Sequence, residues 1–277
     1  MKTNKELYFE AKRLQNKYLN DSCIKNLLIE ANGFDNFSQL IKCFNNECKD
    51  EGQFFADLDR ILSGEPIQYV IGKSEFLDLK LDVNPSVLIP RQESEELALY
   101  VSKTVQKEPN LTNIADICTG SGALAIKIKK DNPHINMYAS DISEDAIDVA
   151  ANNASNNGES ITFFIGNMLD PFLKLGIKLD VIVCNPPYIQ DESTIDEQVY
   201  KYEPHLALIA KPNTKFYEEI FKHVDEVMNP GYLLAFEIGE DMQDVLLDLI
   251  KKYLQGVSYL FKKDIYGKLR FLFIRGE

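Results

Sequence analysis

The sequence contains no tryptophan and only three histidines among its 277 residues. Its five cysteines form no CxxC pair; they are Cys23, Cys43, Cys48, Cys118 and Cys184. Zinc sites need clustered cysteine and histidine, and disulfide frameworks need paired cysteines, so neither is supported. We therefore expect no metal site, and the unpaired thiols favour a reducing compartment, the cytoplasm.

Long hydrophobic runs and an excess of basic charge are also missing. No apolar stretch reaches the roughly 18 residues of a membrane-spanning helix, and the N-terminal segment is amphipathic and charged, unlike a signal peptide. The net charge is -13, and no lysine- or arginine-rich stripe offsets it. Because duplex binding depends largely on neutralising phosphates, we expect neither a membrane nor a direct nucleic-acid partner.

What is present indicates one small and one large folded domain. Residues 1–73 have apolar positions at helical spacing, which predicts a small helical bundle. Residues 74–92 are expected to form a β-hairpin linker. In this prediction residues 76–83 alternate as a half-buried strand, residues 84–86 form the turn, and residues 87–89 are the partner strand.

From residue 93 to residue 277, strand-like and helix-like segments alternate. Strands are predicted at residues 113–118, 136–140, 161–165, 179–184, 232–238, 257–261 and 269–274. This rhythm predicts an α/β fold with a doubly wound, mainly parallel sheet and helices on both faces.

A glycine-containing turn follows the first predicted strand. The segment "DICTGSG", residues 116–122, places two glycines where a strand becomes a helix, so that the backbone can approach a ligand closely. Asp141 ends the next strand, where a carboxylate can bind both hydroxyls of a ribose. Together they predict a ribose-bearing cofactor without identifying it.

The fourth strand ends in Asn185-Pro186-Pro187-Tyr188. The Asn185 amide oxygen and a main-chain carbonyl fixed by the prolines provide two neighbouring acceptors, which suit the two hydrogens of an NH₂ group. Tyr188 can cover a planar group by stacking. An amide or aromatic NH₂ is a poor nucleophile, so its partner must be a strong electrophile such as the methyl sulfonium of S-adenosylmethionine.

These motifs resemble those of the amino methyltransferases of the Rossmann-like, seven-stranded class. The segments "GEPIQYVIGKSEF", "VLIPRQESEEL", "YEPHLAL" and "KDIYGKLRFLFIRG" further resemble bacterial protein-(glutamine-N5) methyltransferases of peptide chain release factors. The resemblance covers nearly all of residues 64–277. It implies a class I S-adenosylmethionine methyltransferase fold and an N-terminal helical bundle that helps to dock the release factor.

The resemblance also implies a set of site residues. The residues expected to bind S-adenosylmethionine are Asp116, Cys118, Thr119, Gly120, Ser121, Gly122, Asp141, Asn167, Met168 and Asn185. The expected catalytic residues, which hold the glutamine amide of a Gly-Gly-Gln loop in release factors 1 and 2, are Asn185, Pro186, Pro187 and Tyr188. A monomer is expected.

Three positions depart from the family pattern. Cys118 replaces a glycine, Asn167 an aspartate, and Gln92 a proline. The Cys118 side chain either crowds the cofactor or points into the sheet. Nearby, Arg91, Glu93 and Glu95 either line the cofactor entrance or form surface ion pairs, and residues 203–205 are a candidate lid over the glutamine.

Three other functions fit part of the pattern. Adenine-N6 methylation of nucleic acid would use the same NH₂ recognition, although the acidic charge balance disfavours it. A non-catalytic protein of the same fold would tolerate the departures at Cys118 and Asn167, but it leaves the intact Asn-Pro-Pro-Tyr without a role. A nicotinamide dehydrogenase would fit the glycine turn and leaves the same stretch unexplained.

Overall fold

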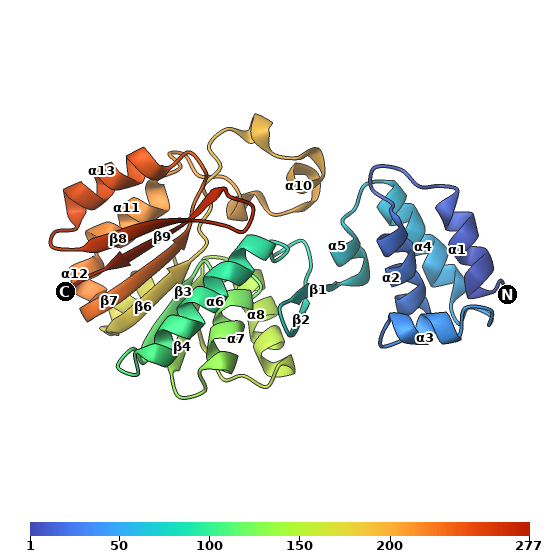
Figure 1. Cartoon of the computed structure of the whole chain (residues 1–277), viewed down its shortest axis with the longest axis horizontal. Helices are drawn as coiled ribbons and strands as arrows, with labels where there is room; N and C mark the ends of the chain where they lie inside the picture. The colour runs from blue at the N-terminus through green and yellow to red at the C-terminus, as the bar shows by residue number, and fades with distance from the viewer. The chain divides into compact units, whose positions relative to one another are not determined.

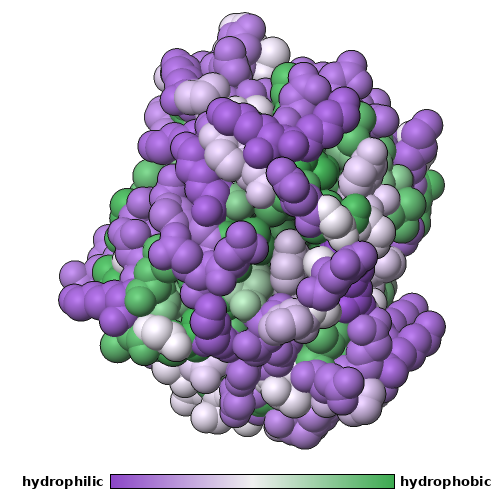
Figure 2. Space-filling model, turned by 90° about the vertical axis from the view of Figure 1, so that its left-hand side faces the viewer, coloured by the Kyte–Doolittle hydropathy of each residue, from purple (hydrophilic) through white to green (hydrophobic).

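The computed structural model describes residues 1–277, which form two compact units, Met1–Lys73 and Ser74–Glu277 (Figure 1). None of the helices combines the length and the apolarity needed to cross a membrane. Figure 2 shows one face of the protein, where hydrophilic residues cover most of the surface and hydrophobic residues lie between them in small groups.

The first unit is a helical bundle. Its helices are α1 (Asn4–Lys12), α2 (Asp21–Asn32), α3 (Phe37–Lys42), α4 (Glu51–Leu62) and α5 (Ile67–Ile71). Polar side chains cap the first four, for example Thr3, which accepts a hydrogen bond from the N–H of Glu6 in a capping box. Leu7, Leu27 and Phe54 are buried together between the helices, so an apolar core holds the bundle.

The second unit contains a seven-stranded sheet in the order β5-β4-β3-β6-β7-β9-β8. The strands are β3 (Asn113–Ile117), β4 (Asn136–Asp141), β5 (Thr162–Ile165), β6 (Leu179–Cys184), β7 (Met228–Glu237), β8 (Ser258–Lys263) and β9 (Leu269–Arg275). The first five in the order are mutually parallel, and β9 is antiparallel to both of its neighbours. The predicted α/β class and seven-stranded, mainly parallel sheet are confirmed.

Helices cover both faces of this sheet (Figure 1). The helices of this unit are α6 (Gln92–Lys107), α7 (Ala123–Asp131), α8 (Glu144–Asn156), α9 (Asp170–Leu175), α10 (Glu197–Tyr202), α11 (Lys215–Lys222), α12 (Val224–Val227) and α13 (Gln243–Tyr253), with 3-10 turns at Glu192–Thr194 and His205–Ala207. Of these, α10 lies in the loop after β6 and has no buried residues. Along β6, Val181 and Val183 join the core under α6 and α7, whereas Ile182 and Cys184 join the core under α11 and α13. Burial on both faces explains why residues 181–184 of β6 are all apolar.

The hairpin before the sheet differs from the prediction. It pairs β1 (Lys73–Phe76) with β2 (Leu79–Asp82), and residues 87–89 are not a strand. The predicted pairing was wrong because Leu77 has a left-handed backbone, φ +52°, and turns the chain in the middle of the expected strand. The adjacent apolar residues Phe76 and Leu77 mark this break in the alternation.

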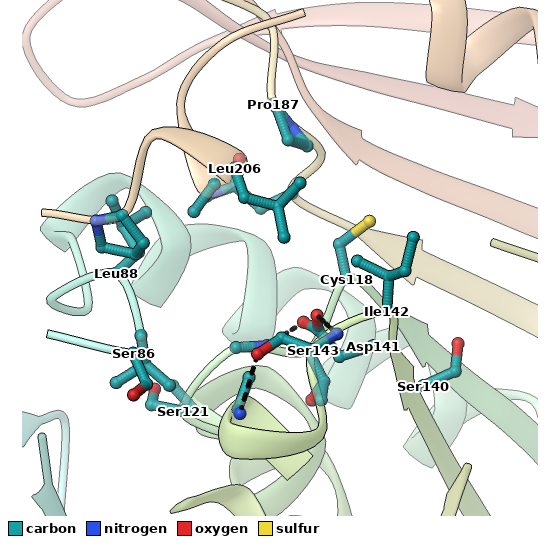
Figure 3. A pocket seen from close by; sticks show the side chains of 18 of the residues that line it. Ser86, Leu88, Cys118, Ser121, Ser140, Asp141, Ile142, Ser143, Pro187 and Leu206 are labelled. Atoms are coloured by element: carbon teal, nitrogen blue, oxygen red, sulfur yellow. Dashed lines mark hydrogen bonds between the residues drawn. The ribbon is translucent and has the colours of Figure 1, made fainter. Parts of the chain in front are cut away.

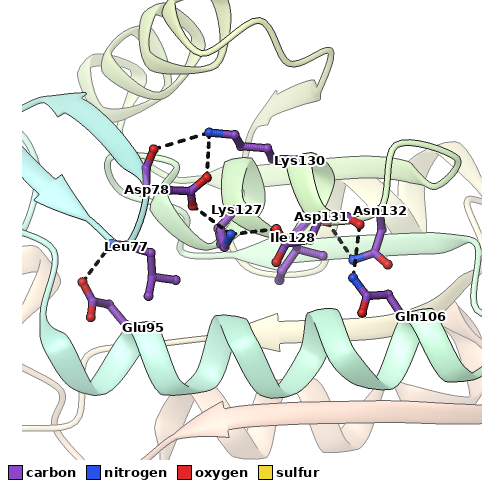
Figure 4. A network of polar contacts seen from close by, with 9 residues as sticks. All are labelled: Leu77, Asp78, Glu95, Gln106, Lys127, Ile128, Lys130, Asp131 and Asn132. Atoms are coloured by element: carbon purple, nitrogen blue, oxygen red, sulfur yellow. Dashed lines mark hydrogen bonds and ion pairs between the residues drawn. The ribbon is translucent and has the colours of Figure 1, made fainter.

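Polar contacts hold the hairpin turn against α6 and α7 (Figure 4). Lys127 donates a hydrogen bond to Asp78 at 2.8 Å, and Lys130 forms an ion pair with the same carboxylate at 2.8 Å. The N–H of Leu77 donates to Glu95 at 2.9 Å. The hydrogen bonds from Lys127 and Lys130 hold the pKa of Asp78 well below its usual range.

Candidate active site

A cavity of about 420 Å³ lies at the carboxyl ends of β3, β4 and β5 (Figure 3). The order of the strands reverses between β3 and β6. On the β3 side the chain continues to β4 and β5, and on the β6 side it continues to β7. Open α/β sheets bind ligands at this kind of switch point. The predicted site residues that line the cavity are Cys118, Thr119, Gly120, Ser121, Asp141, Asn167, Met168, Asn185 and Pro187.

Asp116 lies beneath the glycine turn rather than on the cavity wall. Its carboxylate accepts hydrogen bonds from the Thr119 hydroxyl at 2.6 Å and from the N–H of Ala125 at 3.2 Å. Complete burial raises the pKa of Asp116 to about 7. Asp116 therefore shapes the turn from below.

Gly122 ends the turn and begins α7, also away from the cavity wall. Its φ is +82°, and a Cβ there would lie 3.1 Å from the Ala150 Cβ. Both the backbone angle and the close approach of α8 require glycine at this position.

Cys118 adopts a left-handed backbone, φ +61°, although it has a Cβ. A glycine would take this angle without steric cost. The Cys118 Sγ contacts the Met168 Sδ at 3.6 Å, and Met168 also has a positive φ of 48°. Two unusual backbone angles therefore meet on one wall of the cavity, and the Cys118 side chain lies at this wall.

The Asp141 carboxylate is fixed by main-chain donors. The N–H of Gly120 donates to one oxygen at 2.9 Å and the N–H of Ser143 to the other at 3.0 Å. Burial raises the pKa of Asp141 despite these hydrogen bonds. Each oxygen retains a lone pair, so the carboxylate can accept two further hydrogen bonds from a ligand in the cavity.

Several wall residues were not found from the sequence. Residues 85–88 and Pro90 form one side, next to Arg91, which the sequence had offered as a residue of the cofactor entrance, and Ile142, Leu206 and Phe216 contribute apolar surface. In Figure 3, Ser86 and Leu88 lie across the cavity from Asp141 and Ile142. One of these residues had a signal in the sequence: Ile142 is a large apolar residue directly after Asp141. In the structure the Ile142 side chain is 53% exposed.

A second, smaller cavity of about 140 Å³ adjoins the first. Both cavities are lined by Asn185, Arg91, Leu88 and Ala207, so Asn185 stands where they meet. Tyr188 lines only the second cavity, together with Glu237 at the end of β7. Pro186 is buried and lines neither.

Asn185 is tied to α6 and β7 by hydrogen bonds. Its Nδ2 donates to the Ser94 Oγ at 3.1 Å, and Ser94 donates to the Glu237 carboxylate at 2.7 Å. The Tyr188 hydroxyl donates to the other oxygen of Glu237 at 3.4 Å. Neither Ser94 nor Glu237 was singled out in the sequence.

Arg91 lines both cavities, as one of its two alternatives predicted, and its ion pair is with a buried carboxylate rather than at the surface. Its guanidinium lies 2.6 Å from Glu203, whose side chain is 2% exposed. Glu203 also accepts a hydrogen bond from the N–H of Ile89 at 3.1 Å. The pair joins one wall of the cavity to the loop after Tyr188, and Pro204 from that loop reaches the larger cavity.

Among known proteins, the methyltransferase small domain family matches residues 98–202. The release factor glutamine methyltransferase of Staphylococcus aureus is 38% identical over 218 residues, which are 78% of this chain and 77% of that protein. The chain belongs to the release factor glutamine methyltransferase family. The member from Bacillus subtilis is also 38% identical, over 75% of this chain and 74% of that protein.

A solved structure has the same fold as this member of the release factor glutamine methyltransferase family. A methyltransferase from Pyrococcus furiosus superposes with a TM-score of 0.51 at 18% identity, covering 79% of this chain and 96% of that one. At this identity the likeness concerns the fold alone.

The larger cavity fits the S-adenosylmethionine that such a methyltransferase requires. Asp141 offers lone pairs for the two ribose hydroxyls, and at Gly120 the main chain itself lines the cavity. Ile142 and Met168 provide apolar surface for a flat base. No group of three or more histidine, cysteine, aspartate or glutamate side chains is arranged to bind a metal ion.

Proposed function

We propose that this protein transfers a methyl group from S-adenosylmethionine to the side-chain amide nitrogen of the glutamine in the Gly-Gly-Gln loop of release factors 1 and 2, and thereby modulates translation termination. The observation that carries the proposal is the position of Asn185 between a cavity suited to the cofactor and a smaller cavity beside it. The names of the relatives support a release factor as the substrate.

In this proposal Asn185, Pro186, Pro187 and Tyr188 bind the substrate amide. The Asn185 Oδ1 and a main-chain carbonyl fixed by Pro186 and Pro187 accept the two hydrogens of the NH₂ group, which fixes the nitrogen and favours the positive charge that develops on it. S-adenosylmethionine, when bound, supplies an electrophilic methyl group. The proton can leave the nitrogen after transfer, so the site needs no permanent base.

The remaining residues are assigned to the cofactor. Asp141 binds the ribose, and Asn167 and Met168 lie near the adenine. The turn is formed by Cys118, Thr119, Gly120, Ser121 and Gly122 and is supported from below by Asp116. The contact of Cys118 with Met168 accounts for a cysteine at a glycine position, because the thiol packs against the neighbouring wall.

We assign the docking of the release factor to the helical unit, residues 1–73, with residues 74–92 as the linker and residues 93–277 as the methyltransferase domain. The support is the separate apolar core of the helical unit, which lets it act as a module of its own. We expect the enzyme to act as a monomer in the cytoplasm, where release factors act.

The test is co-expression with a release factor, followed by mass analysis of the peptide that contains Gly-Gly-Gln. We expect one added methyl with the natural protein and a loss of at least about 100-fold in rate with Asn185→Ala, since a positioning acceptor is removed at the reacting atom. Asn152→Ala, at an exposed position of α8, is the matched control. Unchanged methylation by Asn185→Ala would contradict the proposal, and methyl transfer to adenine in nucleic acid instead would favour the alternative.

A further inference from the structure

Asn185 can only hold a substrate NH₂ if its amide is turned the right way. The oxygen must face the substrate, because the Nδ2 hydrogens would oppose the substrate's own hydrogens. An asparagine side chain can rotate to present either atom. Something in the protein must therefore distinguish the two orientations.

The hydrogen-bond chain behind Asn185 makes this distinction. An ionised Glu237 has no hydrogen to give, so the Ser94 hydroxyl must donate its single hydrogen to the carboxylate, 2.7 Å away. Ser94 can then only accept from Asn185, which requires Nδ2 at that contact of 3.1 Å. The Oδ1 of Asn185 is left for the substrate.

The sheet brings these three residues together. In the parallel pairing of β6 with β7, Cys184 lies opposite Phe236, so the next residues, Asn185 and Glu237, leave the two strands side by side. Ser94 is buried in the first turn of α6. Ser94 lies in a helix, Glu237 ends a strand and Asn185 directly follows one, which suits groups that set an orientation.

We propose that Glu237 and Ser94 are positioning residues that fix the orientation of the Asn185 amide, and that methyl transfer requires Glu237 in its ionised form. This inference rests on the proposed function. If Glu237 is protonated, it can donate to Ser94, which then donates to the Asn185 oxygen and turns Nδ2 towards the substrate. The site then presents hydrogens to hydrogens and cannot hold the NH₂ group.

The surroundings of Glu237 allow this switch near neutral pH. Burial raises its pKa to about 7, and the negative charge of Glu93 on α6 acts in the same direction. Arg270 on β9 and the hydrogen bonds from Ser94 and Tyr188 favour the ionised form. The Tyr217 hydroxyl of α11 donates to the main-chain oxygen of Glu237, not to its carboxylate.

The experiment measures kcat and KM for release-factor methylation from pH 5.5 to 9 in the natural protein, Glu237→Gln and Ser94→Ala. We expect kcat of the natural protein to rise with pH through an apparent pKa near 7. Both variants should lose about 10- to 100-fold in kcat, because the Asn185 amide is no longer held in one orientation, while the KM for S-adenosylmethionine changes little. Glu237→Gln should also lose the rise near pH 7, since glutamine does not titrate.

A second readout does not depend on turnover. The side-chain NH₂ signals of Asn185 in a nitrogen-labelled protein, assigned with Asn185→Ala, should shift with pH through the same apparent pKa in the natural protein and stay constant in Glu237→Gln. These signals report the environment of Nδ2 directly.

The matched controls are Ser102→Ala and Glu240→Gln. Ser102 is a buried serine of the same helix whose hydroxyl has no hydrogen-bond partner, and Glu240 is an exposed carboxylate just beyond β7. Neither change should affect kcat or its pH profile. If the natural protein methylates the release factor but Glu237→Gln keeps the same pH profile and NH₂ shifts, the positioning role is wrong. If the natural protein transfers no methyl group, the proposed function itself is wrong.

Discussion

The main-chain N–H of Gly120 donates a hydrogen bond to the Asp141 carboxylate across 2.9 Å. Gly120 belongs to the turn after β3, and Asp141 is the last residue of β4, its neighbour in the sheet. The hydrogen bond therefore fixes the carboxylate relative to the glycine turn before any ligand arrives, and pre-organised groups bind more tightly.

Asp141→Ala should weaken S-adenosylmethionine binding. The change removes the half-buried acceptor for two hydroxyl groups and also leaves the Gly120 N–H without its partner. Each hydrogen bond to a charged group contributes about 1.5–3 kcal/mol. We expect the dissociation constant from titration calorimetry to rise by at least about tenfold. Asp148→Asn, an exposed residue on α8, is the control and should bind like the natural protein. Equal affinity in Asp141→Ala would show that the ribose is bound elsewhere.

Substitutions of Cys118, which stands where the family pattern has a glycine, test whether the side chain or the backbone angle matters more for stability. Cys118→Gly suits a φ of +61° but loses the contact with Met168, so we expect its unfolding free energy to stay within about 1 kcal/mol of the natural value. Cys118→Val places a β-branched residue in the left-handed region and should cost more than about 1 kcal/mol. Urea unfolding with and without S-adenosylmethionine measures both effects. A valine variant as stable as the glycine variant would contradict strain at this turn.

Asp116 should make stability depend on pH. Burial raises its folded pKa to about 7, whereas the unfolded side chain titrates near ~3.9. Between these values the folded state binds more protons, so this residue lowers the unfolding free energy as pH rises from about 4 to about 7. Asp116→Asn cannot titrate, and we expect its Tm relative to the natural protein to improve steadily from pH 5 to pH 8. A constant difference over that range would show that Asp116 does not ionise as inferred.

Asp78 anchors the hairpin turn, but its side chain is 53% exposed. Solvent screening limits the effect, and we expect Asp78→Asn to lower the unfolding free energy by no more than about 1 kcal/mol at neutral pH. Because its folded pKa is depressed, the contribution exists above the unfolded pKa and disappears as pH falls through the folded one. Urea unfolding at low and high salt is the measurement. The difference should shrink with salt, and a salt-independent difference would point to packing instead of charge.

Much of the fold was accessible from local patterns in the sequence. All seven strands of the sheet appear near their predicted positions. In β6, burial on both faces gives the apolar run of residues 181–184, whereas the edge strand β8 is largely exposed. Residues at the carboxyl ends of the parallel strands, including Asp141 and Asn185, could be placed at one edge of the sheet by topology alone.

What could not be predicted depends on contacts between distant segments. Glu237 appears in the sequence as a polar residue at the end of a strand, and its position beside Asn185 follows only from the pairing of β6 with β7. The side of the cavity formed by residues 85–88 and Pro90 was not predicted, because the alternation before it suggested a longer strand than the turn at Leu77 allows. A hydrophobic pattern identifies a strand better than it identifies the strand's partner.

The position of β9 bears on how the molecule reaches its folded state. β9 follows β8 along the chain but lies between β7 and β8 in the sheet. During synthesis, β7 is made about forty residues before β9 can pair with it, so one edge of β7 stays open until that segment emerges. Open strand edges invite pairing with other chains, and a ribosome stalled before Leu269 would hold an aggregation-prone intermediate with an incomplete sheet.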